Sequence, residues 1–254
     1  MNDGTVGTPW RAGVIAAGWG ERLREATPAL KPLVTVGGQP LIARVLGSLA
    51  EASPAEVCVI VNEAGTDVRA WAMSRPWPFH VRWVVETTPS SMHSFLRIVE
   101  TLAADGDEGP FLITTVDTVA PPGAFGAFAR ACRGCDADVT LAVSREFDDE
   151  KPLLVDVADD GVTVEAIGSM VRAGGASEGA GARYATAGYY AVRAGVLHEA
   201  ESARQEGVPA LRHFFERLLK RGWRLAAVPV DAGVDVDRPE DLRAAEAFVK
   251  RIGR

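Results

Sequence analysis

The most informative part of the chain is VIAAGWGERLREATPALKPLVTVGGQPLI, residues 14–42. It begins as a short apolar run of strand length and then turns at Gly18 and Gly20. Glycines let the backbone come close to a ligand and expose consecutive N–H groups. Arg22 adds a planar guanidinium that fits phosphate oxygens, and Lys31 adds a compact positive charge. The stretch therefore predicts a strand followed by a cradle for a polyphosphate group.

Two familiar glycine-rich loops differ from this one. The dinucleotide-binding fingerprint GxGxxG needs a small third residue where this chain has Leu23, and two arginines lie in the turn. The phosphate loop GxxxxGK[ST] occurs nowhere in the sequence. A plain strand-to-helix turn with a surface arginine and lysine is the structural alternative. The basic residues favour phosphate binding of a kind that neither fingerprint describes.

Strands and helices alternate four times in the first half of the chain. Apolar runs predict strands at residues 12–17, 57–62, 80–86 and 111–116. Helical spacing of apolar residues predicts helices at residues 39–50 and 91–104. A polar helix is predicted at residues 66–73 and a further helix at residues 123–132. This alternation predicts a mostly parallel sheet with helices on both faces.

In the second half of the chain, predicted strands follow one another with few helices between them. Strands are predicted at residues 139–144, 153–157, 162–167 and 184–192, as hairpins added to the sheet. Helices near residues 197–204 and 210–221, a strand at 225–230 and a helix opened by Pro239 follow. The small, glycine-rich stretch Ala173–Gly181 is expected to form a mobile loop.

These elements predict an α/β fold. We expect a flexible tail at residues 1–11 and one Rossmann-like three-layer domain over residues 12–254, with a mostly parallel mixed sheet. No proline- or serine-rich linker divides the chain.

Composition excludes several classes of protein. With 254 residues, 47% hydrophobic and 24% charged, the chain is neither disordered nor too small to bury a core. A net charge of −7 argues against nucleic acid as a partner. No run of about 18 apolar residues predicts a membrane span, and the first residues do not resemble a secretory signal.

The cysteines are Cys58, Cys132 and Cys135. An odd number of cysteines without a signal sequence fits a reducing cytoplasm, which is the expected location. The CxxC spacing of the last two has no second pair or histidines beside it, so it is interpreted as chance rather than as a zinc or redox site.

The stretch at residues 14–42 resembles the start of the nucleotidyltransferase family that includes the sugar-1-phosphate pyrophosphorylases, or NDP-sugar pyrophosphorylases. Their pattern is A-A-G-x-G-x-R-[LM], a spacer, and K-P-L-V-x-V-x-G-x-P-L-I. The matching residues are Ala16, Ala17, Gly18, Gly20, Arg22, Leu23, Lys31, Pro32, Leu33, Val34, Val36, Gly38, Pro40, Leu41 and Ile42. The related molybdopterin nucleotidyltransferases share the first part, but in them the lysine usually follows a proline directly.

The resemblance extends to two acidic segments. Asp117 ends an apolar strand in FLITTVDTVAP, and GVDVDRPEDL resembles the family's D-x-D-x-P-E-D-L segment with Asp235 and Asp237. The resemblance implies that Asp117 and Asp237 hold Mg²⁺, with Asp235 as an outer neighbour. The structural alternatives are that Asp117 caps the following turn and that Asp237 is the N-cap of the helix opened by Pro239.

The acceptor side carries a weaker resemblance. In YATAGYYAVRAGVL, Gly188 stands where the family lets a sugar pack against backbone, and the alternative is a bulged edge strand. Ser91 and His93 open a predicted helix where the family contacts base and sugar, although His93 is also explained as a surface residue. Ser169 stands where many sugar enzymes have an acid, which weakens the case for a hexose acceptor.

The resemblance implies a nucleotidyltransferase of the nucleotide-diphospho-sugar transferase type, with a nucleotide-binding N-terminal half and an acceptor-binding C-terminal half. A nucleoside triphosphate would bind to Ala16, Ala17, Gly18, Gly20, Arg22 and Lys31, with Arg22 and Lys31 as catalytic groups. The expected acceptor is a sugar 1-phosphate, while phosphocholine-like, inositol phosphate and molybdopterin acceptors stay open.

Two rival functions are kept. One is a non-catalytic protein of the same fold that binds nucleotides or sugar nucleotides, and the other is a dinucleotide-dependent oxidoreductase, which Leu23 and the basic loop disfavour. The sequence does not identify the nucleobase, and a homo-oligomer is left open.

Overall fold

The structure, a computed structural model, describes residues 9–25, 27–146, 151–171 and 182–253. The expected loop at Ala173–Gly181 lies outside these residues, as does most of the expected tail. Trp10 and Arg11 were assigned to that tail, but they belong to the fold. Trp10 is buried in the core, and the Arg11 guanidinium pairs with Glu56 at 2.7 Å, because the first strand already begins at Arg11.

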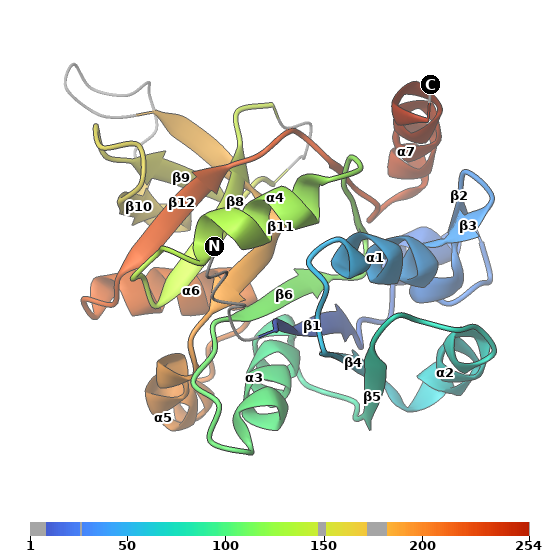
Figure 1. Cartoon of the computed structure of the whole chain (residues 1–254), viewed down its shortest axis with the longest axis horizontal. Coiled ribbons are helices and arrows are strands. Elements are labelled where there is room, and N and C mark those ends of the chain that lie inside the picture. The colour runs from blue at the N-terminus through green and yellow to red at the C-terminus, as the bar shows by residue number, and fades with distance from the viewer. Residues whose placement is uncertain (1–8, 26, 147–150, 172–181, 254) are drawn as a thin grey trace, which may run out of the picture.

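A nine-stranded sheet forms the centre of the described molecule (Figure 1). One path through it has the order β10-β9-β11-β6-β1-β4-β5, while β8 pairs with β11 and β12. The strands are β1 (Arg11–Ala16), β4 (Glu56–Val61), β5 (His80–Val85), β6 (Phe111–Thr115), β8 (Val139–Ser144), β9 (Leu154–Val157), β10 (Val164–Ile167), β11 (Arg183–Val192) and β12 (Leu225–Pro229). β1 pairs in parallel with β4 and β6, whereas β11 is antiparallel to β6, β8 and β9.

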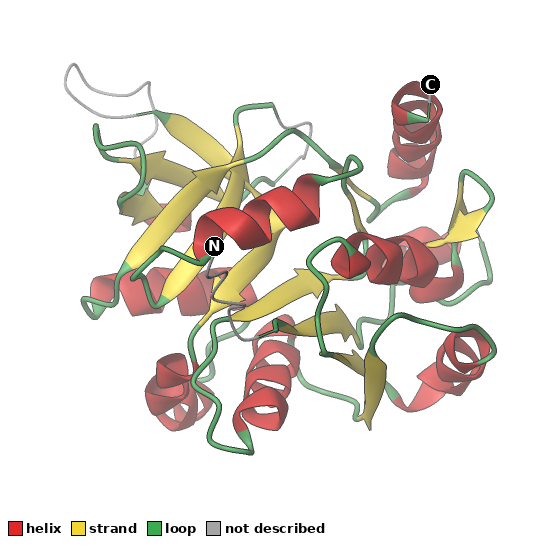
Figure 2. Ribbon diagram, in the orientation of Figure 1, coloured by secondary structure: helices red, strands yellow, loops and turns green. Residues whose placement is uncertain are grey.

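Helices cover both faces of this sheet (Figure 2). They are α1 (Leu41–Ala50), α2 (Thr66–Met73), α3 (Ser91–Ala103), α4 (Ala124–Cys132), α5 (Ala200–Gln205), α6 (Leu211–Lys220) and α7 (Pro239–Ile252). The predicted α/β class with a mixed sheet is confirmed, and the predicted elements agree with the observed ones to within a few residues. Among the described residues, no helix is long and apolar enough to cross a membrane.

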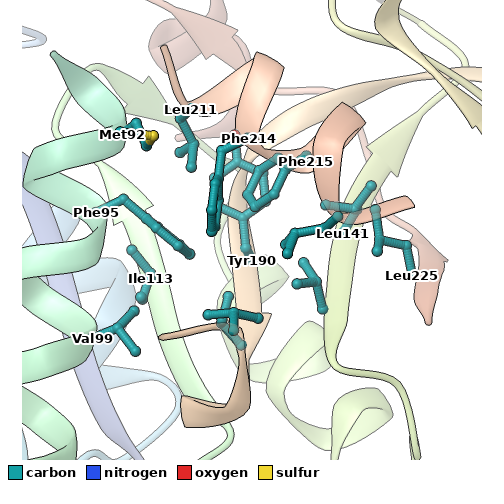
Figure 3. Close-up of a cluster of buried hydrophobic side chains, with 14 of the residues drawn as sticks. Met92, Phe95, Val99, Ile113, Leu141, Tyr190, Leu211, Phe214, Phe215 and Leu225 are labelled. Atoms are coloured by element: carbon teal, nitrogen blue, oxygen red, sulfur yellow. The ribbon is translucent and has the colours of Figure 1, made fainter. Parts of the chain in front are cut away.

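Two cores lie on opposite faces of the sheet. On one face, α3, α5 and α6 pack against the strands, and Figure 3 shows Phe95 of α3 facing Phe214 and Phe215 of α6. Its ring lies 6.0 Å and 5.7 Å from theirs, within the range of favourable aromatic pairs. On the other face, α1, α2 and α4 cover β1 and β4. The apolar runs of the central strands follow from this burial on both sides.

A third, smaller core joins the two ends of the chain. Leu23 of the glycine loop is buried there with Val36, Val119, Val236 and Phe248. These residues come from the start of the chain, from the segment after β6 and from α7 with the segment before it. The position that is small in a dinucleotide fingerprint is therefore a leucine because it anchors the loop in an apolar core.

The long strand β11 contains a bulge at Gly188. Its pairing with β8 shifts register between Thr186 and Tyr190, and Gly188 has φ +81°. A Cβ atom at this position would lie 2.2 Å from Thr118 Oγ1. The predicted bulge is present, but the alternative of an edge strand is wrong, because β11 pairs with β6 on one side and β8 on the other.

Replacing Gly188 by alanine should destabilise the fold by about 2–4 kcal/mol, since the methyl group meets Thr118 and the backbone conformation is strained. Gly161→Ala is the matched control: φ is +72°, and no heavy atom of the described residues lies within 4 Å of the added methyl group. We expect a loss of about 1 kcal/mol there. Urea denaturation measures both, and equal losses would contradict the close packing at Gly188.

Candidate active site

The candidate site lies at the carboxyl edge of the parallel strands. Because β1, β4 and β6 are parallel, the segments that follow them meet at one edge of the sheet, where ligands bind in such folds. The glycine loop follows β1 there, and Asp117 follows β6. Asn62, at the end of β4, is buried and donates from Nδ2 to the Ala17 carbonyl at 3.1 Å. The sequence analysis did not single out Asn62, although it ends a predicted strand at this edge.

Lys31 is held against the glycine loop. It begins the short 3₁₀ helix Lys31–Leu33, and its side chain is only 9% exposed. Gly20 has φ +62°, and a Cβ atom there would lie 2.7 Å from Lys31 Cβ. Glycine at position 20 thus allows both the turn and the close approach of the lysine stem.

Lys31 contacts the two predicted metal ligands. Its Nζ atom lies 2.5 Å from Asp117 Oδ2 and 2.5 Å from Asp237 Oδ1. Arg22 Nη1 lies 3.0 Å from Asp237 Oδ2. The structure therefore brings together four side chains that the sequence analysis selected from three distant segments.

A small antiparallel ladder joins the two acidic segments. β7 (Thr118–Val119) pairs with β13 (Val234–Asp235), and the Val236 N–H donates to the Asp117 carbonyl at 3.1 Å. Each acid lies directly beside this ladder. Backbone hydrogen bonds thus fix Asp117 and Asp237 relative to one another, independently of the ionic contacts between their side chains.

Asp237 is not the N-cap of α7. The N-cap is Arg238, and Asp241 reaches back so that its Oδ2 accepts from the N–H groups of Asp237 and Arg238, at 2.9 and 2.8 Å. Asp241 is the third residue of the helix, and it binds the N–H of the N-cap residue as the acid of a capping box does. The carboxylate of Asp237 is left to face Lys31 and Arg22, which favours the functional interpretation of this residue.

Two threonines that the sequence analysis missed surround Asp117. The Thr115 hydroxyl hydrogen-bonds to the Asp117 carboxylate and lies 3.0 Å from Thr118 Oγ1. Thr118 in turn donates to Asp235 Oδ1 at 3.1 Å. The two hydroxyls thus lie between Asp117 and Asp235, and each donates its one proton to one of these carboxylates. The role of Asp235 as an outer neighbour of a metal ion stays a prediction. Threonine hydroxyls are common in strands, so TTVDT gave no signal that distinguishes this role.

The opposite charges of Lys31 and the two acids stabilise the charged forms of Lys31 and Asp117. Burial alone would lower the pKa of Lys31, but the adjacent Asp117 and Asp237 carboxylates outweigh it and raise the pKa above its ordinary value. Burial would raise the pKa of Asp117, but the Lys31 ammonium and the Thr115 hydroxyl lower it overall. Both groups are consequently charged at neutral pH.

The predicted acceptor residues are placed unequally. Gly188 lies beside the acidic ladder, because a Cβ atom on it would lie 3.3 Å from Asp235 Oδ1. Ser91 instead accepts the Leu211 N–H at 3.1 Å and so caps α6. His93 Nδ1 lies 2.9 Å from Ser90 Oγ, and burial together with the charge of Arg204 lowers the pKa of the imidazole.

Ser91 and His93 make no direct polar contact with the Lys31 cluster within the described ranges. They remain candidates on the same edge of the sheet, at the start of the helix that follows β5.

The segment where an acid is expected is built differently. Ser169 donates its hydroxyl and its backbone N–H to the two carboxylate oxygens of Glu216, at 2.5 and 3.1 Å. Gly168 has φ +58°, and a Cβ atom there would collide with Glu216. The Ser169 side chain is thus bound to α6. The departure from hexose-binding enzymes stays a prediction.

The acid pair fits a divalent cation by its chemistry. Asp117 and Asp237 both reach one atom of Lys31, so their oxygens converge on a common point, and carboxylates are ligands that Mg²⁺ prefers. In the part of the chain that the structure describes, no group of three or more His, Cys, Asp or Glu residues is arranged to hold a metal ion. Two carboxylates suit a cation that keeps several waters and binds phosphate oxygens.

The fold defines a nucleotidyltransferase-type α/β domain. Residues 12–221 match the family described as the MobA-like NTP transferase domain, and the chain belongs to that family. The CMP-5'-(3-aminopropyl)phosphonate synthase of Streptomyces rubellomurinus is 30% identical over 94% of this chain. The mannose-1-phosphate guanyltransferase of Emericella nidulans is 31% identical over 43% of it. The matched regions span 38% and 30% of the length of these two relatives.

Solved structures share the whole fold. The inositol-1-phosphate CTP transferase from T. maritima is similar with a TM-score of 0.78 at 19% identity, over 98% of both chains. A UDP-glucose pyrophosphorylase complexed with UDP-glucose is similar with a TM-score of 0.74 at 14% identity, over 96% of this chain and 99% of the other. These likenesses confirm the predicted nucleotide-diphospho-sugar transferase architecture.

The Asp117 carboxylate should make stability depend on pH. Its pKa is lower in the fold than in the unfolded chain, so it stabilises the fold above the ordinary aspartate value of about 3.9 and loses this effect as the pH falls through the folded value. We expect the difference in unfolding free energy between wild type and Asp117→Asn to be constant from about pH 5 to 8 and to shrink below about pH 4. Urea denaturation across this range measures it. A difference that persists unchanged down to about pH 3 would contradict the assignment.

Proposed function

We propose that this chain is a Mg²⁺-dependent nucleotidyltransferase, which joins a nucleoside monophosphate from a nucleoside triphosphate to a phosphorylated acceptor and releases pyrophosphate. The contact of Lys31 with both Asp117 and Asp237 carries the proposal. The contact supports it because a cation and two carboxylates, which are ligands that Mg²⁺ prefers, lie beside the glycine loop at one edge of the sheet. Family membership and the shared fold support the same reaction class.

The reaction is attack by an acceptor oxygen on the α-phosphorus. The new oxygen–phosphorus bond forms as the bond to pyrophosphate breaks. A phosphate or phosphonate dianion is already a nucleophile at neutral pH, so no general base is needed, and His93 is not assigned that role. The main obstacle is that two anionic reactants must meet in line, so catalysis depends on position and on compensation of charge.

Each residue of the site has a proposed part in this reaction. The N–H groups of the loop at Gly18 and Gly20, together with Arg22, would hold the departing pyrophosphate. Lys31 would bind the α-phosphate or the incoming phosphate. Asp117 and Asp237 would hold the magnesium ion, which when bound neutralises charge on the phosphates. The Thr115 hydroxyl would orient Asp117, and the Thr118 hydroxyl would orient Asp235 beside it.

The acceptor is proposed to carry a phosphate or phosphonate group, with sugar 1-phosphates and alkylphosphonates as the two classes to compare. Similarity to mannose-1-phosphate guanyltransferases favours the first class. Similarity over most of the chain to a CMP-aminopropylphosphonate synthase favours the second, and suggests CTP as the first nucleotide to test. The engagement of Ser169 by Glu216, in place of a free acid, also weakens hexose binding.

A nucleotide-binding protein without catalysis is the second candidate. It would bind a nucleoside triphosphate and release no pyrophosphate. The mutual contacts of Arg22, Lys31, Asp117 and Asp237 speak against it, because binding alone does not require two carboxylates beside the lysine.

A screen distinguishes these alternatives. The four common ribonucleoside triphosphates are incubated with MgCl₂ and with sugar 1-phosphates, myo-inositol 1-phosphate, phosphocholine or aminoalkylphosphonates, and pyrophosphate is measured. Release that depends on both substrates supports the proposal. Tight nucleotide binding without pyrophosphate from any pair would support the second candidate instead.

Lys31→Ala and Asp117→Asn should each lower turnover by about 10²-fold or more, comparable to the loss of one preorganised donor. Lys250→Ala and Asp159→Asn are matched controls, because both residues are exposed and their side chains have no ion pair or hydrogen bond among the described residues. The active substrate pair from the screen provides the assay. Turnover of either site variant within a few fold of the wild type would reject the assigned roles.

A further inference from the structure

Lys31 occupies the point that the two acids share. Its ammonium contacts Asp117 Oδ2 and Asp237 Oδ1, and Arg22 contacts the other oxygen of Asp237. The chain's own cations therefore balance both carboxylates. A divalent cation that uses the same pair has to bind oxygens with which Lys31 and Arg22 already interact.

We propose that Lys31 and the divalent cation compete for Asp117 and Asp237, and that the nucleotide resolves this competition by offering Lys31 its phosphates. The inference rests on the proposed function, because it assigns the cation to this acid pair. Free divalent cation then binds weakly, whereas cation and nucleotide together bind strongly.

The side chains are suited to such an exchange. A lysine ammonium is a point charge on a flexible stem, so it can turn to a neighbouring anion while the stem stays packed against Gly20. The Arg22 side chain is 60% exposed and can likewise exchange Asp237 for a phosphate. The acids cannot move in the same way, because the β7–β13 ladder and Asp241 fix the backbone that carries them.

The competition couples the two ligands. The cation has to overcome the attraction between Lys31 and the acids, and this attraction is strong because the lysine is almost buried. A nucleotide phosphate beside Lys31 gives the ammonium a new anionic partner. It therefore offsets most of the free energy that is lost when the cation separates Lys31 from the two acids. By linkage, the nucleotide strengthens cation binding by the factor by which the cation strengthens nucleotide binding.

Titration calorimetry with MnCl₂ alone tests the competition, since Mn²⁺ shares the preference of Mg²⁺ for oxygen ligands. Lys31→Met should bind Mn²⁺ about tenfold or more tightly than wild type, and Arg22→Gln about threefold more tightly, because each removes a competing charge. Arg24→Gln is the matched control. Arg24 is exposed in the same loop, lies over the Trp19 ring and has no carboxylate partner within the described ranges. Its affinity should equal that of the wild type.

The double variant Lys31→Met/Asp117→Asn tests whether the ion binds to Asp117. The tighter Mn²⁺ binding expected for Lys31→Met should be lost in this double variant. A gain that survives there, or an equal gain in Arg24→Gln, overturns the inference, as does unchanged affinity in Lys31→Met. If Lys31→Met does not fold, the Mn²⁺ affinities of Arg22→Gln and Arg24→Gln are compared instead. Equal affinities in these two variants then overturn the inference. The titration needs no substrate, so absence of pyrophosphate release would refute the proposed function without altering this result.

Discussion

The nearly buried ammonium of Lys31 is the constraint around which the rest of the site is arranged. A lysine that is 9% exposed loses hydration and has to be compensated by nearby negative charge. The compensation comes from Asp117 and Asp237, which lie 86 and 206 residues further along the chain. The fold must therefore bring the ends of β6 and β13 to the loop after β1. Parallel pairing, the β7–β13 ladder and the small core around Leu23 each contribute to this convergence.

Backbone contacts hold the acidic segments in place, while the carboxylates of Asp117 and Asp237 remain free to bind cations. Asp241, inside the first turn of α7, accepts the N–H groups of Asp237 and of the N-cap Arg238, so its carboxylate serves the helix while that of Asp237 remains available to the site. Gly20 and Gly188 let backbone or side chains approach where a Cβ atom would collide. The acids are thus held by hydrogen bonds and steric fit that do not depend on their charge. Exchange of their cationic partners can occur without rearrangement of the fold.

The sequence predicted the elements well because each has a simple physical signal. Strands buried on both faces are short apolar runs, and the helices carry one apolar face. Arg22 and Lys31 were selected because a glycine loop with basic residues suits a polyphosphate group, whereas Asp117 and Asp237 were selected because their segments resemble those of the nucleotidyltransferase family. Trp10 and Arg11 were missed because their partners are distant in sequence: Trp10 packs into the core, and Arg11 pairs with Glu56 of the neighbouring strand. Asn62, Thr115 and Thr118 were missed because neutral side chains acquire a role only from their neighbours in space.

The nucleotide side and the acceptor side of the candidate site also differ in how far their residues can be recognised from sequence. The nucleotide side needs charged groups at fixed places, so its residues can be identified from their type and spacing. The acceptor side can use hydroxyls, backbone groups and shape, and its predicted residues diverge: Gly188 lies at the acidic ladder, whereas Ser91 caps α6. Ser169 is bound by Glu216 of α6, a contact between residues 47 positions apart. Under the proposed function, acceptor preference would depend on packing between distant elements, and changes there would alter the substrate while the Lys31 cluster stays intact.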